Sequence, residues 1–325
     1  MKSKIKSSSH LIFKFYWIIS WLLVQFLFIA TPQKSFAASC CGGGFAAPSL
    51  IVGDDQAQIT NSISYNHIID DVGTDSLWHK RKSNEINATI KIEAAHILSG
   101  KYLSNRFLSD RWQLGFSLPI ISRSRADQTS SGLGDVAGTI GYEYLPDWDY
   151  NPWRPRGLGF LILTLPTGRS VNESETAYQL DSRGRGFLAL GAGTILTKII
   201  NKWDVFSSIE VHNSFKKKYS NSQSSGTLNP GFGTNFGFGV GYNLDVVRLG
   251  SGISWSYEDA VDVTGTSSSS GSAQRFATAS ISASYLFEHE WATTINYTDQ
   301  TIVGSPTNTS LSRGVNILVQ KRWLR

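Results

Sequence analysis

The sequence predicts an all-β protein, a transmembrane antiparallel up-and-down β-barrel of about 12 strands that follows a cleaved signal peptide. Three observations predict it: an apolar amino-terminal segment, stretches of side chains that alternate with a period of two, and connections that alternate between long and short. After residue 37 no apolar run approaches the roughly 20 residues that a membrane-spanning helix needs.

Residues 1–37 are predicted to be the signal peptide. Residues 1–10 are basic, residues 11–30 are mostly apolar, and Ser35-Phe36-Ala37 places small residues where a signal peptidase cleaves. An uncleaved anchor helix is the alternative, because the apolar run is nearly long enough to span a bilayer. This segment carries 5 lysines and no acid, so the net charge of +5 belongs to it, and nucleic acid is not an expected partner.

Residues 38–56 are expected to form a periplasmic amino-terminal segment with a Cys-Cys-Gly-rich motif, Cys40-Cys41-Gly42-Gly43-Gly44. Cys40 and Cys41 could form a disulfide, carry a lipid, bind a soft metal as thiolates, or pair with another protein in the oxidising periplasm. Two sulfurs make an incomplete metal site, so the cysteines are weak metal candidates and no cofactor is expected.

The barrel is expected over residues 57–325, and its clearest strand is 231–244. There Phe232, Phe236 and Phe238 alternate with glycines, which gives a strand one apolar face and one small face. The same period defines 12 segments in all: 57–69, 84–97, 111–121, 135–145, 157–166, 187–197, 203–215, 231–244, 248–257, 275–287, 291–299 and 313–323. At 157–166 and 187–197 both faces are apolar, and the register stays open.

The connections between these segments predict the topology. Those after the odd-numbered segments are long and polar, whereas 199–202, 245–247 and 288–290 are short. Long loops on one rim, tight turns on the other and an even strand count are typical of barrels in the outer membrane of Gram-negative bacteria.

Four tryptophans are expected in one belt at a membrane interface, where an indole places its apolar body in lipid and its N–H near the headgroups. Each lies at the tight-turn end of a segment: Trp112, Trp203, Trp291 and Trp323.

Charged side chains of the opposite register are expected to line the pore, because they would be costly facing lipid. They are Lys91, Glu93, Glu143, Asp204, Glu210 and His212. Acids outnumber bases in this set, so an open pore would prefer cations. The alternative is a closed plug of salt bridges, since 12 strands leave a narrow lumen.

Two motifs, Gly132-Leu133-Gly134-Asp135-Val136 and Leu165-Pro166-Thr167-Gly168, follow Leu118-Pro119-Ile120 in order. With them the sequence resembles the outer-membrane transporter family named for the meta-pathway of phenol degradation. The resemblance implies an exported barrel that passes small, often aromatic or hydrophobic compounds. Its motif residues here are Gly132, Gly134, Asp135, Leu165, Pro166 and Gly168. Their geometric interpretation is that Gly134 and Pro166 shape strand ends while Asp135 accepts hydrogen bonds from nearby amides; contact with solute is the alternative.

These patterns together predict a porin-like channel or transporter for small, hydrophobic or aromatic solutes, embedded in outer-membrane lipids. The alternative is a structural or assembly barrel whose Cys-Cys segment docks a periplasmic partner. An enzyme is not expected, since the sequence has no Gly-x-Ser-x-Gly turn and no evident Ser-His pair. The solute, the oligomeric state, the fate of the cysteines and whether the lumen is open or plugged stay undetermined.

Overall fold

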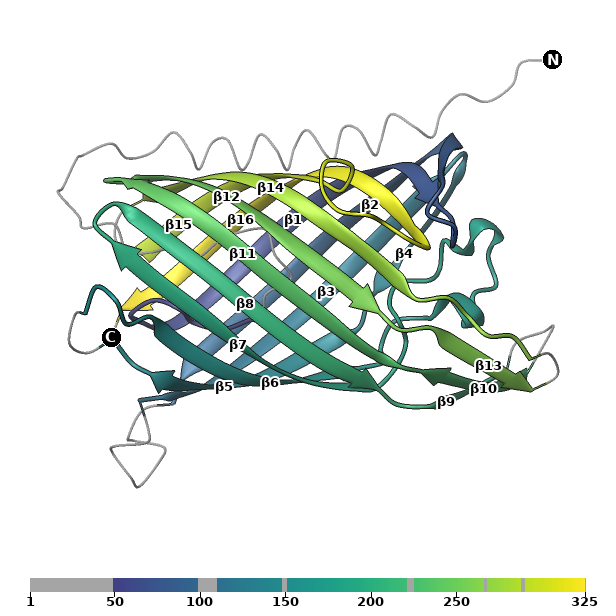
Figure 1. Cartoon of the computed structure of the whole chain (residues 1–325), viewed down its shortest axis with the longest axis horizontal. Coiled ribbons are helices and arrows are strands. Elements are labelled where there is room, and N and C mark those ends of the chain that lie inside the picture. Colours follow the sequence, from purple (N-terminus) through teal and green to yellow (C-terminus); the bar gives the residue numbers. More distant parts are fainter. Residues whose placement is uncertain are drawn as a thin grey trace, which may run out of the picture. The chain divides into compact units, whose positions relative to one another are not determined.

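The computed structural model describes residues 49–98, 110–147, 151–220, 225–265, 268–287 and 290–324. Within them, 12 antiparallel strands close into a ring (Figure 1). Their bounds are β1 (Asp55–Val72), β2 (Trp78–Ile97), β3 (Trp112–Arg125), β5 (Val136–Leu145), β6 (Arg156–Leu165), β7 (Ala189–Ile200), β8 (Trp203–Ser214), β11 (Phe232–Leu244), β12 (Val247–Glu258), β14 (Gln274–Phe287), β15 (Trp291–Asp299) and β16 (Thr309–Leu324). The predicted fold class is confirmed, and each of these strands contains or overlaps one predicted segment. The predicted signal peptide lies outside the described residues.

The ring closes because the first strand pairs with the last. The β1–β16 register runs from Asp55 opposite Leu324 to Val72 opposite Thr309. The remaining junction, β2 with β3, runs from Glu85 opposite Arg125 to Ile97 opposite Gln113. Closure leaves no unpaired sheet edge in the ring, which a lipid environment requires because it offers backbone groups no hydrogen-bond partner.

The outer surface of the ring is apolar on every strand. Each strand carries at least one large apolar side chain that is 42% or more exposed: Ile59, Ile90, Leu114, Ile140, Leu161, Leu190, Ile209, Phe238, Leu249, Ile281, Ile295 and Val315. Inward neighbours are mainly small, polar or charged, and buried serines, threonines and arginines are among them. Apolar side chains on a complete outer band are expected in lipid rather than in water, so the period of two in the sequence reports two different environments.

The two rims differ as the sequence predicts. Residues 201–202 connect β7 to β8, and residues 245–246 connect β11 to β12. Asn201 and Asp245 adopt φ values of 54° and 46°, in the left-handed region that two-residue hairpin turns use. We call this end the tight-turn rim and the opposite end the long-loop rim.

Four short strands at the long-loop rim were not predicted. They are β4 (Gln128–Leu133), β9 (Lys217–Ser220), β10 (Ser225–Pro230) and β13 (Val261–Gly265). β4 extends a hairpin from β3, and the other three form a small sheet that projects beyond one end of the ring (Figure 1). These strands are short and rich in polar residues, so they lack the apolar period that marks a strand facing lipid.

The connection between the first two strands is a correction to the prediction. Residues 70–83 were expected to form a long loop, yet β1 and β2 stay paired up to Val72 opposite Trp78, and residues 73–77 make the turn. Strand pairing depends on the backbone and continues where the apolar side chains end. The sequence pattern reports only the portion that faces lipid.

Two short 3-10 helices, η1 (Val171–Glu173) and η2 (Ala177–Gln179), lie between β6 and β7. In the described part of the chain no helix has both the length and the apolar character to cross a membrane.

Candidate functional site

The predicted pore-lining acids lie on the inner face, and basic side chains pair with them. Arg156 Nε donates to Glu143 Oε1 at 2.5 Å. Arg248 donates to both oxygens of Asp204, from Nε at 2.8 Å and from Nη2 at 2.5 Å. Lys91 Nζ lies 2.9 Å from Glu93 Oε1.

The expected surplus of negative charge is therefore wrong for these acids. Arg156 precedes the predicted segment 157–166, so the alternation does not include it. Arg248 opens segment 248–257 in the inward register, and its position in the alternation identifies it as a further inward base. Buried carboxylates keep their charge at low cost only when a cation and hydrogen bonds accompany them, so such partners were to be expected.

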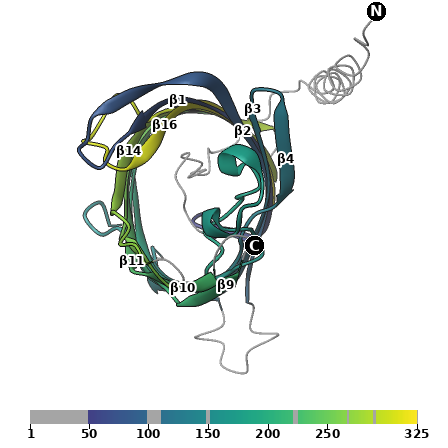
Figure 2. The same ribbon diagram turned by 90° about the vertical axis from the view of Figure 1, so that its right-hand side faces the viewer.

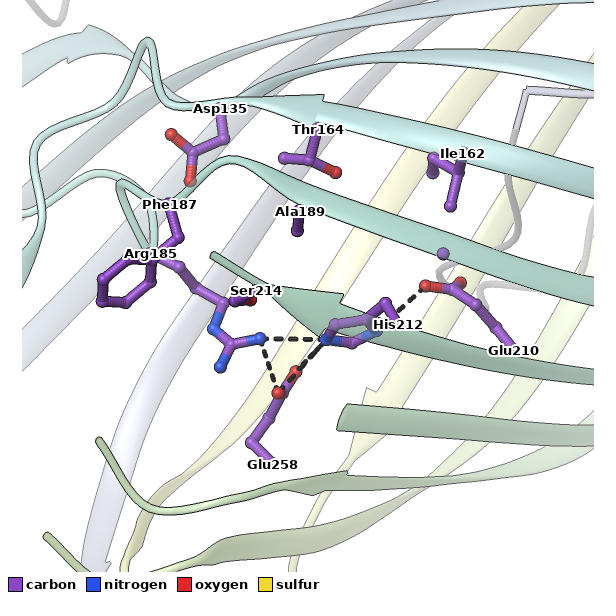
Figure 3. A pocket seen from close by; sticks show the side chains of 11 residues that line it. Asp135, Ile162, Thr164, Arg185, Phe187, Ala189, Glu210, His212, Ser214 and Glu258 are labelled. Atoms are coloured by element: carbon purple, nitrogen blue, oxygen red, sulfur yellow. Dashed lines mark hydrogen bonds and ion pairs between the residues drawn. The ribbon is translucent and has the colours of Figure 1, made fainter. Parts of the chain in front are cut away.

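The remaining predicted pair, Glu210 and His212, belongs to a four-residue cluster (Figure 3). His212 Nδ1 lies 3.2 Å from Glu210 Oε1, and Nε2 lies 3.1 Å from Glu258 Oε1. Arg185 Nη1 contacts His212 Nε2 at 2.9 Å and Glu258 Oε2 at 2.5 Å. Glu258 follows the inward alternation of β12, whereas Arg185 lies in a connection whose sequence has no period to indicate its direction.

Residues 166–188, which connect β6 to β7, form what we call the inward loop. Figure 2 shows this segment, in teal, inside the ring of strands. One carboxylate binds both of its ends: Asp135 Oδ1 accepts a hydrogen bond from the Gly168 amide at 2.9 Å, and Oδ2 accepts one from the Gly186 amide at 3.0 Å. A Cβ atom on Gly184 would lie 2.4 Å from Asp135 Oδ2, so the backbone approaches this closely only as glycine.

The family-motif residues meet at this point. Thr167 Oγ1 donates to the Gly134 carbonyl at 2.6 Å, and the Gly134 amide donates to the Pro119 carbonyl at 2.9 Å. A Cβ on Gly132 would lie 2.6 Å from Arg183 Nε of the inward loop. Leu165 faces outward at the end of β6 and Pro166 follows it, exposed. Asp135 thus bonds to nearby amides, the role that the geometric interpretation gave it, and it also borders the cavity described below.

The inward loop also contacts strands on both sides of the β6–β7 pair that it joins. Toward β3, Arg123 Nη1 donates to the carbonyls of Gln179 at 3.2 Å and Ser182 at 3.0 Å, and its Nη2 donates to Glu85 at 2.8 Å. Toward β9, Lys217 Nζ donates to the Gly186 carbonyl at 3.0 Å. These contacts hold the loop across part of the lumen.

Within the loop a buried carboxylate organises the backbone. Asp181 accepts hydrogen bonds from Arg169 Nη1 at 2.7 Å, Thr176 Oγ1 at 2.8 Å and the Glu175 amide at 3.2 Å, and one from the Ser174 hydroxyl. Burial raises the pKa of Asp181, but these hydrogen bonds outweigh burial and hold the pKa well below its ordinary value of 3.8. The hydrogen bond to Asp181 in turn raises the pKa of Arg169.

A cavity of about 150 Å³ lies between the inward loop and the barrel wall (Figure 3). Ile162, Phe187 and Ala189 give it apolar surface, and the Arg185–His212–Glu258 cluster gives it a charged one. Ser214 also lines it: the residue is 4% exposed, and its Oγ has no hydrogen-bond partner. Ser214 follows His212 by two residues in one predicted segment, so its inward direction could have been read from the sequence.

Of the predicted periplasmic segment 38–56, the structure describes residues 49–56: Asp55 and Gln56 begin β1, and residues 49–54 contact inward-facing side chains at the tight-turn end of the lumen. Leu50 packs against the inward side chains Leu158, Phe160, Ile195 and Phe206. This packing explains why 157–166 and 187–197 are apolar on both faces: one face meets lipid, and the other meets the chain's own amino-terminal segment.

Hydrogen bonds fix this segment. The Ile51 amide donates to Gln113 Oε1 at 2.6 Å, Gln113 Nε2 donates to the Ile51 carbonyl at 3.1 Å, and Ser49 Oγ donates to Glu93 at 2.8 Å. Cys40 and Cys41 lie outside the described residues.

The four predicted belt tryptophans are 36% to 53% exposed and lie at strand ends on the tight-turn rim. Tyrosines of neighbouring strands extend the aromatic surface: the ring centroids of Trp112 and Tyr142 are 4.8 Å apart, and those of Trp203 and Tyr242 are 4.9 Å apart. Lys321 Nζ lies 5.1 Å from the centre of the Trp291 ring and 5.9 Å from that of Trp323.

The described residues contain no group of three or more His, Cys, Asp or Glu side chains that could hold a metal ion. Ser214 and His212 share a strand but are not arranged as nucleophile and base. Both ring nitrogens of His212 contact carboxylates, while the Ser214 hydroxyl has no partner.

No protein-family model matches the chain, and no curated protein sequence matches it. Among solved structures, an outer membrane channel from Pseudomonas putida F1 aligns with a TM-score of 0.65 and 15% identity, covering 82% of this chain and 96% of that one. The translocator domain of the autotransporter NalP from Neisseria meningitidis aligns with a TM-score of 0.43 and 10% identity, covering 82% and 88%. The monoaromatic hydrocarbon channel CymD aligns with a TM-score of 0.38 and 9% identity, covering 84% and 90%.

The first of these likenesses shows the fold: this chain is a barrel of the bacterial outer-membrane type. The more specific resemblance to the phenol-degradation transporter family stays a prediction.

Proposed function

We propose that the protein is an outer-membrane channel for small solutes, with the inward loop as its constriction. The observation that carries this proposal is the loop itself. It is anchored at both ends by Asp135, lies inside the ring and borders a cavity. A barrel that served only as a membrane anchor would need no ordered loop of charged and hydrogen-bonding groups in its interior, because such groups add little net stability.

Small hydrophobic or aromatic molecules are the proposed solutes. An apolar strip runs along the inner face of β6, β7 and β8. Ile162 lines the cavity and also packs against the cluster of Leu158, Phe160, Ile195 and Phe206. This strip would give an apolar solute continuous contact from the cavity toward the tight-turn rim, where Leu50 covers it. The family resemblance supports the same solute class.

Single-channel recording in planar bilayers tests the channel. Because the inward acids have basic partners, we expect a small conductance with weak selectivity between cations and anions. Reversal potentials in a salt gradient measure that selectivity. Strong selectivity for either sign would contradict the paired lumen.

Asp135→Ala tests the constriction. This substitution removes both acceptors that hold the loop ends, so we expect a severalfold larger or noisier conductance. Asp127→Ala is the matched control, because Asp127 is an exposed acid in the turn between β3 and β4. If neither the wild type nor Asp135→Ala conducts ions or passes solutes, the channel proposal fails. The alternative of an assembly barrel that docks a periplasmic partner would then gain support.

A further inference from the structure

Residues 49–54, which we call the amino-terminal strap, lie against the inner wall of the barrel although they belong to no strand. Ser49, Leu50 and Ile51 are 6%, 5% and 1% exposed. Leu50 belongs to the buried apolar cluster on β6, β7 and β8, whereas Ile51 packs with two apolar side chains of β2. In the ring, β3 and β5 separate these two clusters, so two consecutive side chains of the strap join inner faces that are not adjacent.

The wall between these clusters leaves room for the strap through two glycines. A Cβ atom on Gly115 of β3 would lie 1.8 Å from the Ser49 carbonyl oxygen, and one on Gly141 of β5 would lie 2.7 Å from Leu50 Cδ2. The first of these contacts is with the backbone of the strap. The wall and the strap therefore approach this closely only because residue 115 is glycine.

Side chains of the ring hold the backbone of the strap. Gln113 accepts a hydrogen bond from the Ile51 amide and donates one to the Ile51 carbonyl, and Gln58 Nε2 donates to the Leu50 carbonyl at 3.1 Å. These partners satisfy backbone groups that would otherwise be buried without hydrogen bonds. None of the three bonds belongs to the pairing between ring strands, so the strap can leave the wall while the ring stays closed.

We propose that the amino-terminal strap is a displaceable barrier: seated, it closes most of the tight-turn end of the lumen, and released, it opens that end to solutes. A ring of 12 strands leaves a narrow lumen, so a stretch of backbone with its side chains takes up much of it. Leu50 holds the place at the end of the apolar strip that a departing solute would take. This inference rests on the proposed channel and adds a second barrier in series with the inward loop.

Two substitutions release the strap from different sides. Gly115→Ala places a methyl group where the Ser49 carbonyl lies, and Leu50→Asp places a charge in an apolar cluster while leaving every ring strand unchanged. Gly138→Ala on β5 is the matched control, because a Cβ atom there meets nothing within 4 Å. Single-channel conductance of the full-length protein should rise severalfold in both release variants and stay at the wild-type level in the control.

Thiol labelling measures release of the strap without using conductance. Ile51→Cys, combined with Cys40→Ser and Cys41→Ser, gives the chain one thiol, at a position that is 1% exposed in the native protein. A water-soluble maleimide should label this thiol slowly in that background and in Gly138→Ala, and much faster in both release variants. Heat-dependent migration on a detergent gel verifies that each barrel is folded.

Faster labelling together with larger conductance, in both release variants and not in Gly138→Ala, supports the proposal. The proposal is overturned if the thiol stays protected in both release variants, or if it becomes reactive while the conductance stays at the level of a conducting wild type. Failure of the channel itself gives a different result. A reactive thiol with no conductance in the release variants or in Asp135→Ala refutes the proposed function, and the barrier with it.

Discussion

At the scale of single residues, neighbours along one strand meet different surroundings. On β11, Phe238 is 46% exposed on the outer face. Asn235 faces inward, where its Oδ1 accepts a hydrogen bond from Ser256 Oγ at 2.7 Å. A charged substitution should therefore be tolerated better at Asn235 than at Phe238, since the Phe238 side chain contacts lipid and the Asn235 side chain faces a hydrogen-bonded lumen.

We predict that Phe238→Asp destabilises the folded barrel much more than Asn235→Asp does. The first change removes an apolar ring from lipid and places a charge there, which together cost roughly 3 kcal/mol or more. The second keeps an oxygen acceptor for Ser256. Urea unfolding in lipid vesicles measures both. Equal stabilities would mean that the assigned faces of β11 are wrong.

At the scale of elements, the sequence predicts strands that face lipid far better than it predicts what fills the ring. Alternation located all 12 ring strands, because lipid demands apolar side chains on one face. It missed β4, β9, β10 and β13, which lie beyond the apolar band. Arg185 and the inward loop could not be placed, because their positions depend on contacts such as Asp135 with Gly186 between distant parts of the chain. Arg248 and Ser214, by contrast, follow the alternation and were identifiable.

The inward loop should loosen in acid. Burial raises the pKa of Glu173, but hydrogen bonds from Lys217 and Ser170 outweigh it, so this pKa, like that of Asp181, lies below its ordinary value. Such carboxylates stabilise the folded loop fully above their ordinary pKa values, 4.5 and 3.8. They lose that contribution progressively as the pH falls from there through their lower pKa values in the folded loop.

We therefore expect single-channel conductance to be constant from about pH 7 to pH 5 and to become larger or noisier below about pH 4. Asp181→Asn should show the loosened behaviour already at neutral pH, whereas Asp127→Asn should resemble the wild type. An Asp181→Asn variant that conducts like the wild type at neutral pH, together with a wild-type conductance that stays flat throughout the acid range, would contradict this role of the loop carboxylates.

At the scale of the whole molecule, a buried ion pair joins the two ends of the barrel. Arg322 on β16 donates to both oxygens of Asp55 on β1, from Nε and Nη2 at 2.8 Å each. The side chains are 2% and 5% exposed. The pair therefore lies at the junction where the ring closes.

Breaking this pair should weaken closure. Arg322→Met leaves the Asp55 carboxylate buried without its cation and should cost roughly 3–5 kcal/mol. The double variant Asp55→Leu/Arg322→Met removes both charges and should recover much of that loss. Urea unfolding in vesicles compares them, and a double variant no more stable than Arg322→Met would show that the buried charge is not the cause.

The β1–β16 junction also determines how such a barrel can change in size. Both β1 and β15 run antiparallel to β16, so they run parallel to each other. A chain that lost β16 could not close by pairing β1 with β15 in the antiparallel pattern of the other strands, and without another pairing two open edges would face lipid. Gain or loss of strands therefore keeps every pair of the ring antiparallel only when it occurs in twos, as whole hairpins, and the hairpin is the unit by which insertion or deletion could make this ring wider or narrower.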